Sequence, residues 1–205
     1  NYYFLSTLRE IINSDNEWQK SRAVYKDGTP SKTKSIFGVQ FRYDVLKGEA
    51  PIQTIRQIPI KKAIGEILWI YQDQTNQLRV LRDKYGVKYW DSWDIGDGTI
   101  GKRYGYTIRK HDLLNKLLNG IVTDVLSKRH MINLWQEVDL TDGPGLMPCA
   151  GMTRYMFTQD KYGTYYLHME LKQRSSDFLT ANFLNQAQYF ALGRMIVSHL
   201  NSLKK

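Results

Sequence analysis

Cysteine is nearly absent from this chain, since Cys149 is the only one among 205 residues. A single thiol cannot form an internal disulfide, which agrees with a reducing compartment and leaves the thiol available for chemistry. No apolar run approaches the roughly 20 residues of a membrane-spanning helix. The first residues lack the basic region and small-residue cleavage site of a secretory signal. These absences predict a soluble, cytoplasmic protein with no membrane partner.

Metal-binding spacing is also missing. The four histidines have no cysteine or carboxylate partners at the spacing of a metal site, so no metal is predicted. The chain contains no internal repeat and no low-complexity tract. Its length suits one domain, whose core would bury well over half of the surface of the unfolded chain.

Acidic residues are outnumbered, and the formal net charge is +9. Such a balance implies an anionic partner, which could be a phosphate-bearing metabolite, a polyanionic cofactor or nucleic acid. The basic residues are spread along the chain, without a basic tail or a groove-reading motif. This spread favours capture of a small anion over binding of a nucleic acid, although weak RNA binding and a merely solvated basic surface both stay open.

Three segments space their apolar residues as an amphipathic helix does. The first runs from Pro59 to Gln72, with proline in its first turn and Glu66 beside its apolar stripe. The second is predicted over 112–118, ending near Gly120. The third begins near Asn182 and carries its stripe on Leu184, Ala187, Ala191 and Met195.

Three other segments predict strands. Residues 35–43 alternate apolar and polar side chains, 131–135 form a short apolar run, and 152–171 read as a hairpin with its turn at 160–163. An aromatic, glycine-rich loop covers 90–101. Because strands and helices are interspersed without a regular βαβ alternation, the predicted class is α+β.

Cys149 follows Leu146-Met147-Pro148 and precedes the run Gln173-Arg174-Ser175-Ser176-Asp177 by a few dozen residues. A thiol combined with arginine, hydroxyls and a carboxylate indicates a nucleophile with anion-binding groups. Only the thiolate is reactive, and an ordinary cysteine pKa near ~8.5 leaves a few per cent ionised at neutral pH, so a cationic neighbour is needed. Taken singly, a free cysteine is more often a small buried hydrophobe.

Further blocks give this chemistry a context, and the chain resembles the thymidylate synthase family from about residue 36 to residue 200. Any one block is weak, but the ordered set at near-family spacing is specific. The blocks are Ser35-Ile36-Phe37-Gly38, Glu66-Ile67-Leu68-Trp69, Trp90-Asp91-Ser92-Trp93, Gly98 to Tyr104-Gly105, Ser127-Lys128-Arg129, Pro148-Cys149, Gln173 to Asp177, and Asn185-Gln186-Ala187-Gln188-Tyr189.

The resemblance implies a mixed β-sheet flanked by helices and a homodimer formed through the sheet face. It implies reductive methylation of dUMP to dTMP with 5,10-methylenetetrahydrofolate. In this chemistry the Cys149 thiolate adds to C6 of the uracil ring, and C5 then attacks the one-carbon unit. Covalent addition divides one difficult alkylation into easier steps.

The resemblance assigns catalytic roles to Cys149, Glu66, Tyr104 and Arg174. Glu66 organises proton transfer through ordered water, a role helped by burial that raises its pKa towards neutrality. Tyr104 assists removal of the C5 proton. Arg174 both stabilises the sulfur and holds the substrate phosphate through its planar fork of donors.

Substrate-binding roles are implied for Arg22, Lys128, Arg129, Gln173, Arg174, Ser175, Asp177 and Asn185. Lys128 and Arg129 reach the phosphate from the second subunit, and Ser175 donates a hydroxyl. The Asn185 amide reads O4 and N3 of uracil, where an aspartate would mark cytosine-using relatives. Arg22 is the nearest candidate for a further phosphate ligand, although its loop departs from the family in spacing.

Folate-binding roles are implied for Trp90, Trp93, Leu146 and Asp177. A flat apolar heterocycle with donor edges suits a pocket of aromatic faces and one fixed acceptor. Without the resemblance, both tryptophans would be interpreted as core residues, as Trp69 and Trp135 are.

The chain departs from the family pattern at Lys128, where an arginine is usual, and at Ala150, where many members have histidine. A later His-x-Tyr motif and the closing C-terminal segment would come after Lys205. We therefore expect residues 1–205 to form one catalytic domain without its C-terminal portion. Two alternatives stay open: a phage-type dUMP hydroxymethylase, in which water captures the methylene, and a catalytically silent RNA-binding relative.

Overall fold

The computed structural model of this chain describes residues 1–140 and 145–203, and of Arg22 it describes only the backbone. Internal contacts divide the chain into two compact units, Asn1–Ile58 and Pro59–Lys205. The single catalytic domain over 1–205 stays a prediction. Among the described residues, no helix is both long enough and apolar enough to cross a membrane.

The first unit consists of one helix, a two-stranded ribbon and extended chain. Helix α1 spans Tyr2–Asn13, β1 spans Gln19–Val24, β2 spans Pro30–Thr33 and the 3-10 helix η1 spans Val45–Lys47. The two strands are antiparallel. The ring of Tyr3 packs against Phe41 and Tyr43, with centroid distances of 5.2 and 5.4 Å. These contacts tie α1 to the chain that follows the ribbon.

The strand predicted over residues 35–43 is wrong. The ribbon ends at Thr33, and within the described part of the chain residues 34–44 belong to no strand. Phe37 is fully exposed at 103 %, and Val39 is 44 % exposed. The alternating pattern therefore marks apolar side chains that this unit leaves uncovered, because a half-buried strand requires a partner sheet.

The second unit is built on a three-stranded antiparallel sheet in the order β3-β4-β5. Strand β3 spans Met131–Asn133, β4 spans Ala150–Gln159 and β5 spans Tyr165–Gln173. Strands β4 and β5 form the predicted hairpin, which is confirmed. Every pairing among the described residues is antiparallel, where a mixed sheet was expected.

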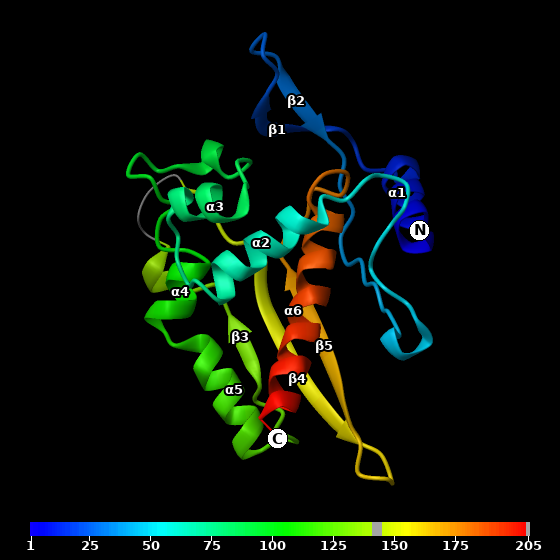
Figure 1. Ribbon diagram of the computed structural model, residues 1–205. Coiled ribbons are helices and arrows are strands. Elements are labelled where there is room, and N and C mark those ends of the chain that lie inside the picture. Colours follow the sequence, from blue (N-terminus) through cyan, green and yellow to red (C-terminus); the bar gives the residue numbers. More distant parts are fainter. Residues whose placement is uncertain (141–144, 204–205) are drawn as a thin grey trace. The chain divides into compact units, whose positions relative to one another are not determined.

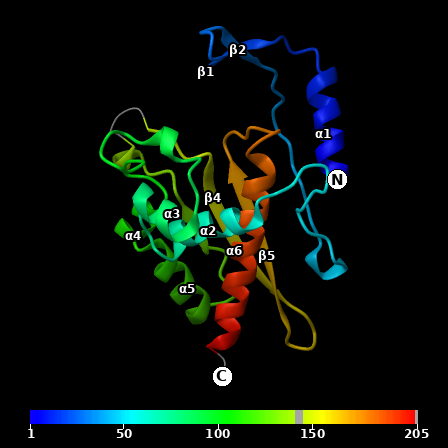
Figure 2. The ribbon, with the colours of Figure 1, turned by 45° about the horizontal axis from the view of Figure 1, so that its top comes forward.

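Helices cover one face of this sheet. They are α2 (Ile60–Tyr71), α3 (Leu78–Tyr85), α4 (Gly105–Lys110), α5 (Leu113–Thr123) and α6 (Asn182–Ser202), with the 3-10 helices η2 (Asp91–Trp93) and η3 (Glu137–Asp139) in the connections. Figure 1 shows α6 running along the sheet, with α2 crossing it and α5 beside β3. Figure 2 shows α2 and α6 over the same face. The predicted α+β class is confirmed.

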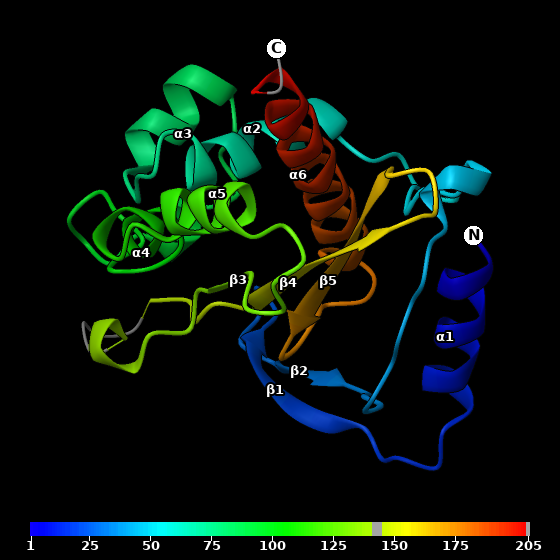
Figure 3. The same ribbon diagram turned by 90° about the horizontal axis from the view of Figure 1, so that it is seen from below.

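The core lies between these helices and the inward face of the sheet. In β4 the side chains of Thr153, Tyr155 and Phe157 are buried, and those of Arg154 and Met156 are exposed. This alternation is the one expected of a strand with one covered face. Ile67 and Trp69 of α2 and Leu192 and Ile196 of α6 complete the core. Figure 3 shows the helices of the second unit on one side of the β3-β4-β5 sheet.

Two predicted helices differ in detail from the structure. Helix α5 runs through Gly120 to Thr123 instead of ending there. A Cβ at Gly120 would lie 3.4 Å from the His130 ring, an ordinary van der Waals contact, and the φ of Gly120 is not positive, so this glycine neither caps nor breaks the helix. Helix α6 begins at the predicted residue, but its most buried positions include Phe183, Leu192 and Ile196, while Leu184, Ala191 and Met195 are only half-buried.

Candidate active site

The pairing of β4 with β5 brings Cys149 and Arg174 together. Cys149 directly precedes β4, Arg174 directly follows β5, and Ala150 pairs with Gln173. The Arg174 backbone N–H also donates to the Cys149 carbonyl at 3.0 Å. The Arg174 Nη2 lies 3.6 Å from the Cys149 Sγ, and the Ser175 Oγ lies 3.5 Å from it. The half-buried sulfur thus has a cation and a hydroxyl beside it.

The Arg174 guanidinium is held in place from several sides. Its Nε donates to the Pro148 carbonyl and its Nη2 to the Met147 carbonyl, both at 3.0 Å. Its Cζ lies 5.7 Å from the centre of the Trp135 ring, within cation–π range. Trp135 was interpreted as a core residue, yet it is half-buried and supports the arginine. Sequence spacing carried no signal for this role.

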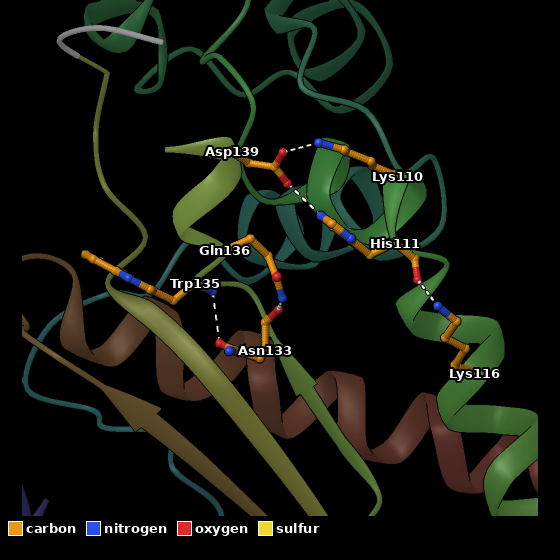
Figure 4. Close-up of polar contacts among 7 residues, drawn as sticks. All are labelled: Lys110, His111, Lys116, Asn133, Trp135, Gln136 and Asp139. Atoms are coloured by element: carbon orange, nitrogen blue, oxygen red, sulfur yellow. Dashed lines mark hydrogen bonds and ion pairs between the residues drawn. The ribbon is translucent and has the colours of Figure 1, made fainter. Parts of the chain in front are cut away.

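The segment that carries Trp135 is anchored by a cluster of Asp139, Lys110 and His111, which we call the Asp139 cluster (Figure 4). Asp139 is fully buried, accepts from the Lys110 ammonium and lies 2.7 Å from the His111 Nε2. Burial acts to raise the Asp139 pKa, but the hydrogen bonds from Lys110 and His111 outweigh it, and the pKa is lowered. The cluster fixes the end of η3 to the end of α4.

Tyr104, to which the resemblance assigns a catalytic role, directly precedes helix α4. Tyr104 is buried and has positive φ (51°) with ψ at −109°, which is strained for a residue with a side chain. A Cβ on Gly105 would lie 2.3 Å from the Thr75 carbonyl oxygen, so only glycine fits there. This turn places the Tyr104 hydroxyl where it accepts from the Cys149 backbone N–H at 3.1 Å.

Burial raises the Tyr104 pKa, and smaller contributions from Tyr189 and Cys149 act in the same direction. The phenol therefore stays protonated across the physiological range, and its proton remains available for donation. The Tyr104 ring packs edge-on against Trp90 at 5.5 Å between centroids. Trp90 is itself 7 % exposed and so belongs to the wall of the core as well as to the predicted folate site.

Glu66 is buried on α2, with 6 % of its surface exposed. Its Oε2 accepts a hydrogen bond from the Tyr89 hydroxyl at 2.5 Å. Burial raises the Glu66 pKa, and smaller effects of Tyr89, Trp90 and Gln188 act in the opposite direction. Tyr89 and Gln188 were not among the predicted site residues. No motif marks Tyr89, and Gln188 stands in a quoted block where only Asn185 was assigned a role.

The predicted folate residues Trp93 and Leu146 lie on two neighbouring segments. Trp93 is 40 % exposed in η2, and Leu146 is half-buried in the segment before Cys149. The two segments approach closely, because a Cβ on Gly145 would lie 3.1 Å from the Ile95 Cγ2. The exposed Trp93 indole thus lies on a loop that packs against the segment preceding Cys149.

The remaining predicted residues of the second unit lie near the ends of β5 and α6. Gln173 ends β5, and its buried Nε2 has no hydrogen-bond partner among the described residues. Asp177 is exposed, and its Oδ1 accepts from the backbone N–H groups of Leu179 and Thr180 at 3.1 Å. Asn185 is half-buried in the first turn of α6, and its backbone N–H donates to the Ala181 carbonyl.

Lys128 and Arg129 are not brought to the Cys149 side chain within this chain. Both are exposed in the connection between α5 and β3. Met131 pairs with Arg154, five positions into β4 from Cys149, and the basic pair lies beyond that end of β3. At about 3.3 Å per residue, the pair and the thiol lie at opposite ends of the β3 and β4 ladder. Arg22 lies in β1 of the first unit, and its side chain is outside the described residues.

Comparisons with known proteins show the family of this chain. The family model described as thymidylate synthase matches residues 2–204. A thymidylate synthase of Lactococcus lactis subsp. cremoris is 46 % identical over 198 residues, covering 97 % of this chain and 71 % of that protein. One from Streptococcus pneumoniae (strain 70585) is 45 % identical, covering 96 % of this chain and 70 % of that protein.

A solved structure gives the same result at the level of the fold. The thermostable thymidylate synthase A of Bacillus subtilis superimposes with a TM-score of 0.83 at 32 % identity, covering 95 % of this chain and 71 % of that one. The family model and the relatives together cover nearly the whole of this chain. The chain belongs to the thymidylate synthase family.

Proposed function

We propose that this chain is a thymidylate synthase that reductively methylates dUMP to dTMP with 5,10-methylenetetrahydrofolate. One observation carries the proposal: the Cys149 sulfur lies 3.6 Å from an arginine donor and 3.5 Å from a serine hydroxyl, within a member of this family. A half-buried thiol held beside a guanidinium and a hydroxyl is placed to attack a substrate whose phosphate the same arginine binds.

The Cys149 thiolate adds to C6 of the uracil ring, forming a carbon–sulfur bond and making C5 nucleophilic. Arg174 stays fixed during this step, because the carbonyls of Met147 and Pro148 and the ring of Trp135 hold its guanidinium. Its donors are then shared between the sulfur and the substrate phosphate. A preformed arrangement of this kind avoids reorganisation during the reaction.

Proton movements fall to Glu66 and Tyr104. After C5 has formed its new bond, its proton must leave before the carbon–sulfur bond breaks and the thiolate is released. Burial raises the pKa of Glu66, which brings a carboxyl closer to the range in which it can exchange protons with bound water. The Tyr104 hydroxyl is already fixed next to the Cys149 backbone.

The phosphate and the base of dUMP contact different parts of the chain. Arg174 and Ser175 bind the phosphate, together with Lys128 and Arg129 of the second subunit. Asn185 reads the uracil edge, and Gln173 supports binding beside it. The buried Nε2 of Gln173, which has no hydrogen-bond partner among the described residues, supports this assignment, since a buried donor without a partner is costly unless a ligand satisfies it.

The residues present fit a folate. Trp90 and Trp93 offer aromatic surface, the second with 40 % of its area exposed, and Leu146 adds aliphatic surface. Asp177 is an exposed acceptor held by two backbone N–H groups. When bound, the folate supplies the one-carbon unit and the hydride. The chain's own part is to stack the pterin ring, fix its donor edge through Asp177 and hold it over C5 of the substrate.

A homodimer through the sheet face belongs to the same proposal. The outward side chains of β4 and β5, among them Met156 and His168, provide the surface. The position of Lys128 and Arg129, away from the thiol of their own chain, supports their donation to the partner's site. We propose a cytoplasmic location for this dimer.

The adduct itself tests the proposal. The purified protein, incubated with 5-fluorodeoxyuridylate and methylenetetrahydrofolate, should gain the mass of both ligands in intact-mass spectrometry. Cys149→Ser should gain neither, yet should still bind dUMP in calorimetry, because phosphate and base contacts survive. Absence of any adduct on the unsubstituted protein would contradict the enzymatic assignment.

Product mass separates this activity from the hydroxymethylase alternative. Turnover of dUMP should give a methyl product, and a hydroxymethyl product would show that water captures the methylene. The RNA-binding alternative predicts a different result: affinity for RNA that falls steeply with salt and is indifferent to Cys149→Ser.

A further inference from the structure

We infer that Tyr89 is a positioning residue for Glu66: its hydroxyl holds the Oε2 oxygen of the buried carboxylate during the proton transfers of the methylation. The inference rests on the proposed function and deepens it, because it names the group that orients the carboxylate. Tyr89 contacts no reacting atom and acts only through its hydrogen bond to Glu66.

The contact is short and buried at the carboxylate. The Tyr89 hydroxyl donates to the Glu66 Oε2 at 2.5 Å, near the short end of the range for a hydroxyl donating to a carboxylate. Glu66 has 6 % of its surface exposed. A carboxylate withdrawn from water in this way requires donors from the protein, because an unpaired buried charge is very costly.

The turn that carries Tyr89 is fixed by contacts besides the one between Tyr89 and Glu66. Helix α3 ends at Gly86, whose φ of 66° is readily adopted only by glycine. Val87 is then fully buried, and its N–H donates to the Leu81 carbonyl at 3.3 Å. Trp90 on the other side is 7 % exposed. Val87 and Trp90, on either side of Tyr89 in the sequence, are both anchored in the core. The turn between them can therefore hold the Tyr89 phenol towards α2.

The other groups acting on Glu66 come from different elements. Gln188 and Tyr189 belong to α6, Tyr104 precedes α4, and Trp90 follows Tyr89. The titratable ones among these are tyrosines, and burial raises the pKa of Tyr89, Tyr104 and Tyr189, so all three are neutral at physiological pH. Among the described residues, the donors that act on Glu66 are neutral, and they offset only part of the burial, since the Glu66 pKa stays raised. Tyr89 makes the largest of these contributions.

Tyr89→Phe removes one donor and retains the ring. The Glu66 pKa should rise, because the hydrogen bond stabilises the charged form. The acid limb of the kcat profile should therefore move to higher pH, with kcat at neutral pH reduced about tenfold to a hundredfold, the range for a hydrogen bond to a charged group. The KM for dUMP should change little. A role limited to stability would lower the Tm without moving the acid limb.

Tyr85→Phe is the matched control. Its hydroxyl also donates to a carboxylate, Asp73 Oδ2 at 2.8 Å, but at the end of α3 and not at Glu66. This variant should keep both the kcat and the pH profile of the unsubstituted protein. Carbon NMR of protein labelled in its glutamate carboxyl groups, with Glu66→Gln to identify the signal, gives a readout independent of activity.

The outcomes distinguish failure of the proposed function from failure of the inference about Tyr89. If the unsubstituted protein makes no thymidylate, the proposed function fails, whereas the NMR titration still shows whether Tyr89 controls the Glu66 carboxyl. If the protein is active and Tyr89→Phe leaves both the NMR titration of Glu66 and the acid limb of kcat unchanged, the inference is overturned. A shift of both the NMR titration and the acid limb towards higher pH in Tyr89→Phe, but not in Tyr85→Phe, supports it.

Discussion

A carboxyl group among aromatic rings is the most unusual residue environment in this chain. Glu66 shares α2 with Ile67 and Trp69, which are 1 % and 0 % exposed, and is itself 6 % exposed. Burial favours the neutral form of such a group, so its placement costs folding free energy at neutral pH. Residues with a catalytic role often carry such a cost, because the property that makes them reactive also opposes burial.

The pH dependence of stability should reveal this cost. Burial raises the Glu66 pKa in the folded state above its value in the unfolded chain. Between those two values the folded state binds more protons, so the free energy of unfolding falls as pH rises and levels off above the folded-state pKa. Glu66→Gln should therefore be more stable than the unsubstituted protein at neutral pH, and the difference should shrink as pH falls towards the ordinary carboxyl pKa.

Urea denaturation at a series of pH values measures this difference. Asp83→Asn is the control, because Asp83 is exposed on α3 of the same unit, away from the proposed dimer surface. Equal stability of Glu66→Gln and the unsubstituted protein at every pH would show that the carboxyl carries no burial cost. Activity should be lost in Glu66→Gln even though its stability rises.

At the scale of elements, two short connections position the side chains of the candidate site. The turn into α4 combines a strained tyrosine with a glycine pressed against Thr75. The connection after β3 carries Trp135 under Arg174 and ends in the Asp139 cluster. Both connections meet at α4, whose start holds Tyr104 and whose end holds Lys110 and His111.

Gly105→Ala should destabilise the second unit. The added Cβ would lie 2.3 Å from the Thr75 carbonyl oxygen and 2.6 Å from its nitrogen, so backbone must move. We expect a loss of about 1–3 kcal/mol in the free energy of unfolding, the usual range for overpacking. Gly151→Ala is the control, because a Cβ there meets no atom within 4 Å. Equal effects of the two substitutions in urea denaturation would show that the contact with Thr75 is not restrictive.

Asp139→Asn should weaken the cluster that anchors Trp135. The substitution removes the charge that Lys110 and His111 share and leaves a fully buried amide. The expected loss is about 1–3 kcal/mol at neutral pH. Because the folded-state Asp139 pKa is lowered, its contribution is present above the ordinary carboxyl pKa and lost as pH falls through the folded-state value.

Thermal unfolding followed from neutral to acid pH distinguishes this contribution from a general defect. The difference between Asp139→Asn and the unsubstituted protein should close at acid pH. A constant difference across the whole range would indicate that shape, and not charge, accounts for the loss.

At the scale of the whole molecule, the positions of two basic residues predict an assembly. Lys128 and Arg129 lie at the far end of the β3 and β4 ladder from Cys149. A phosphate held beside Cys149 and Arg174 could meet them only from another copy of the chain. In a closed dimer with twofold symmetry, each site would then receive the pair from its partner.

Mixing two inactive variants tests this assembly. Cys149→Ser supplies an intact basic pair, and a double variant, Lys128→Ala with Arg129→Ala, supplies an intact thiol. After unfolding and refolding together, half of the dimers should be mixed, and each should hold one complete site, which restores about a quarter of the unsubstituted activity. If the basic pair acts within its own chain, no site is complete and the mixture stays inactive.

The family and the main helices and strands could be predicted from the sequence alone. Apolar spacing predicted α2, the hairpin of β4 and β5, and the start of α6, because a helix or strand with one covered face imposes its period on the chain. It failed at 35–43, where alternation occurs without a covering sheet. The resemblance named Cys149 and Arg174 as a pair, and their proximity follows from the ladder that joins their strands.

The side chains that support Cys149, Arg174 and Glu66 could be identified only from the folded structure. Tyr89 and Trp135 stand in no helical or strand pattern that would direct them to Glu66 and Arg174, since their contacts join residues 23 and 39 positions apart in sequence. Local spacing reports which face of an element is covered, but not what covers it. The partners of a buried charge come from packing between elements, and that packing is settled by the folded chain as a whole.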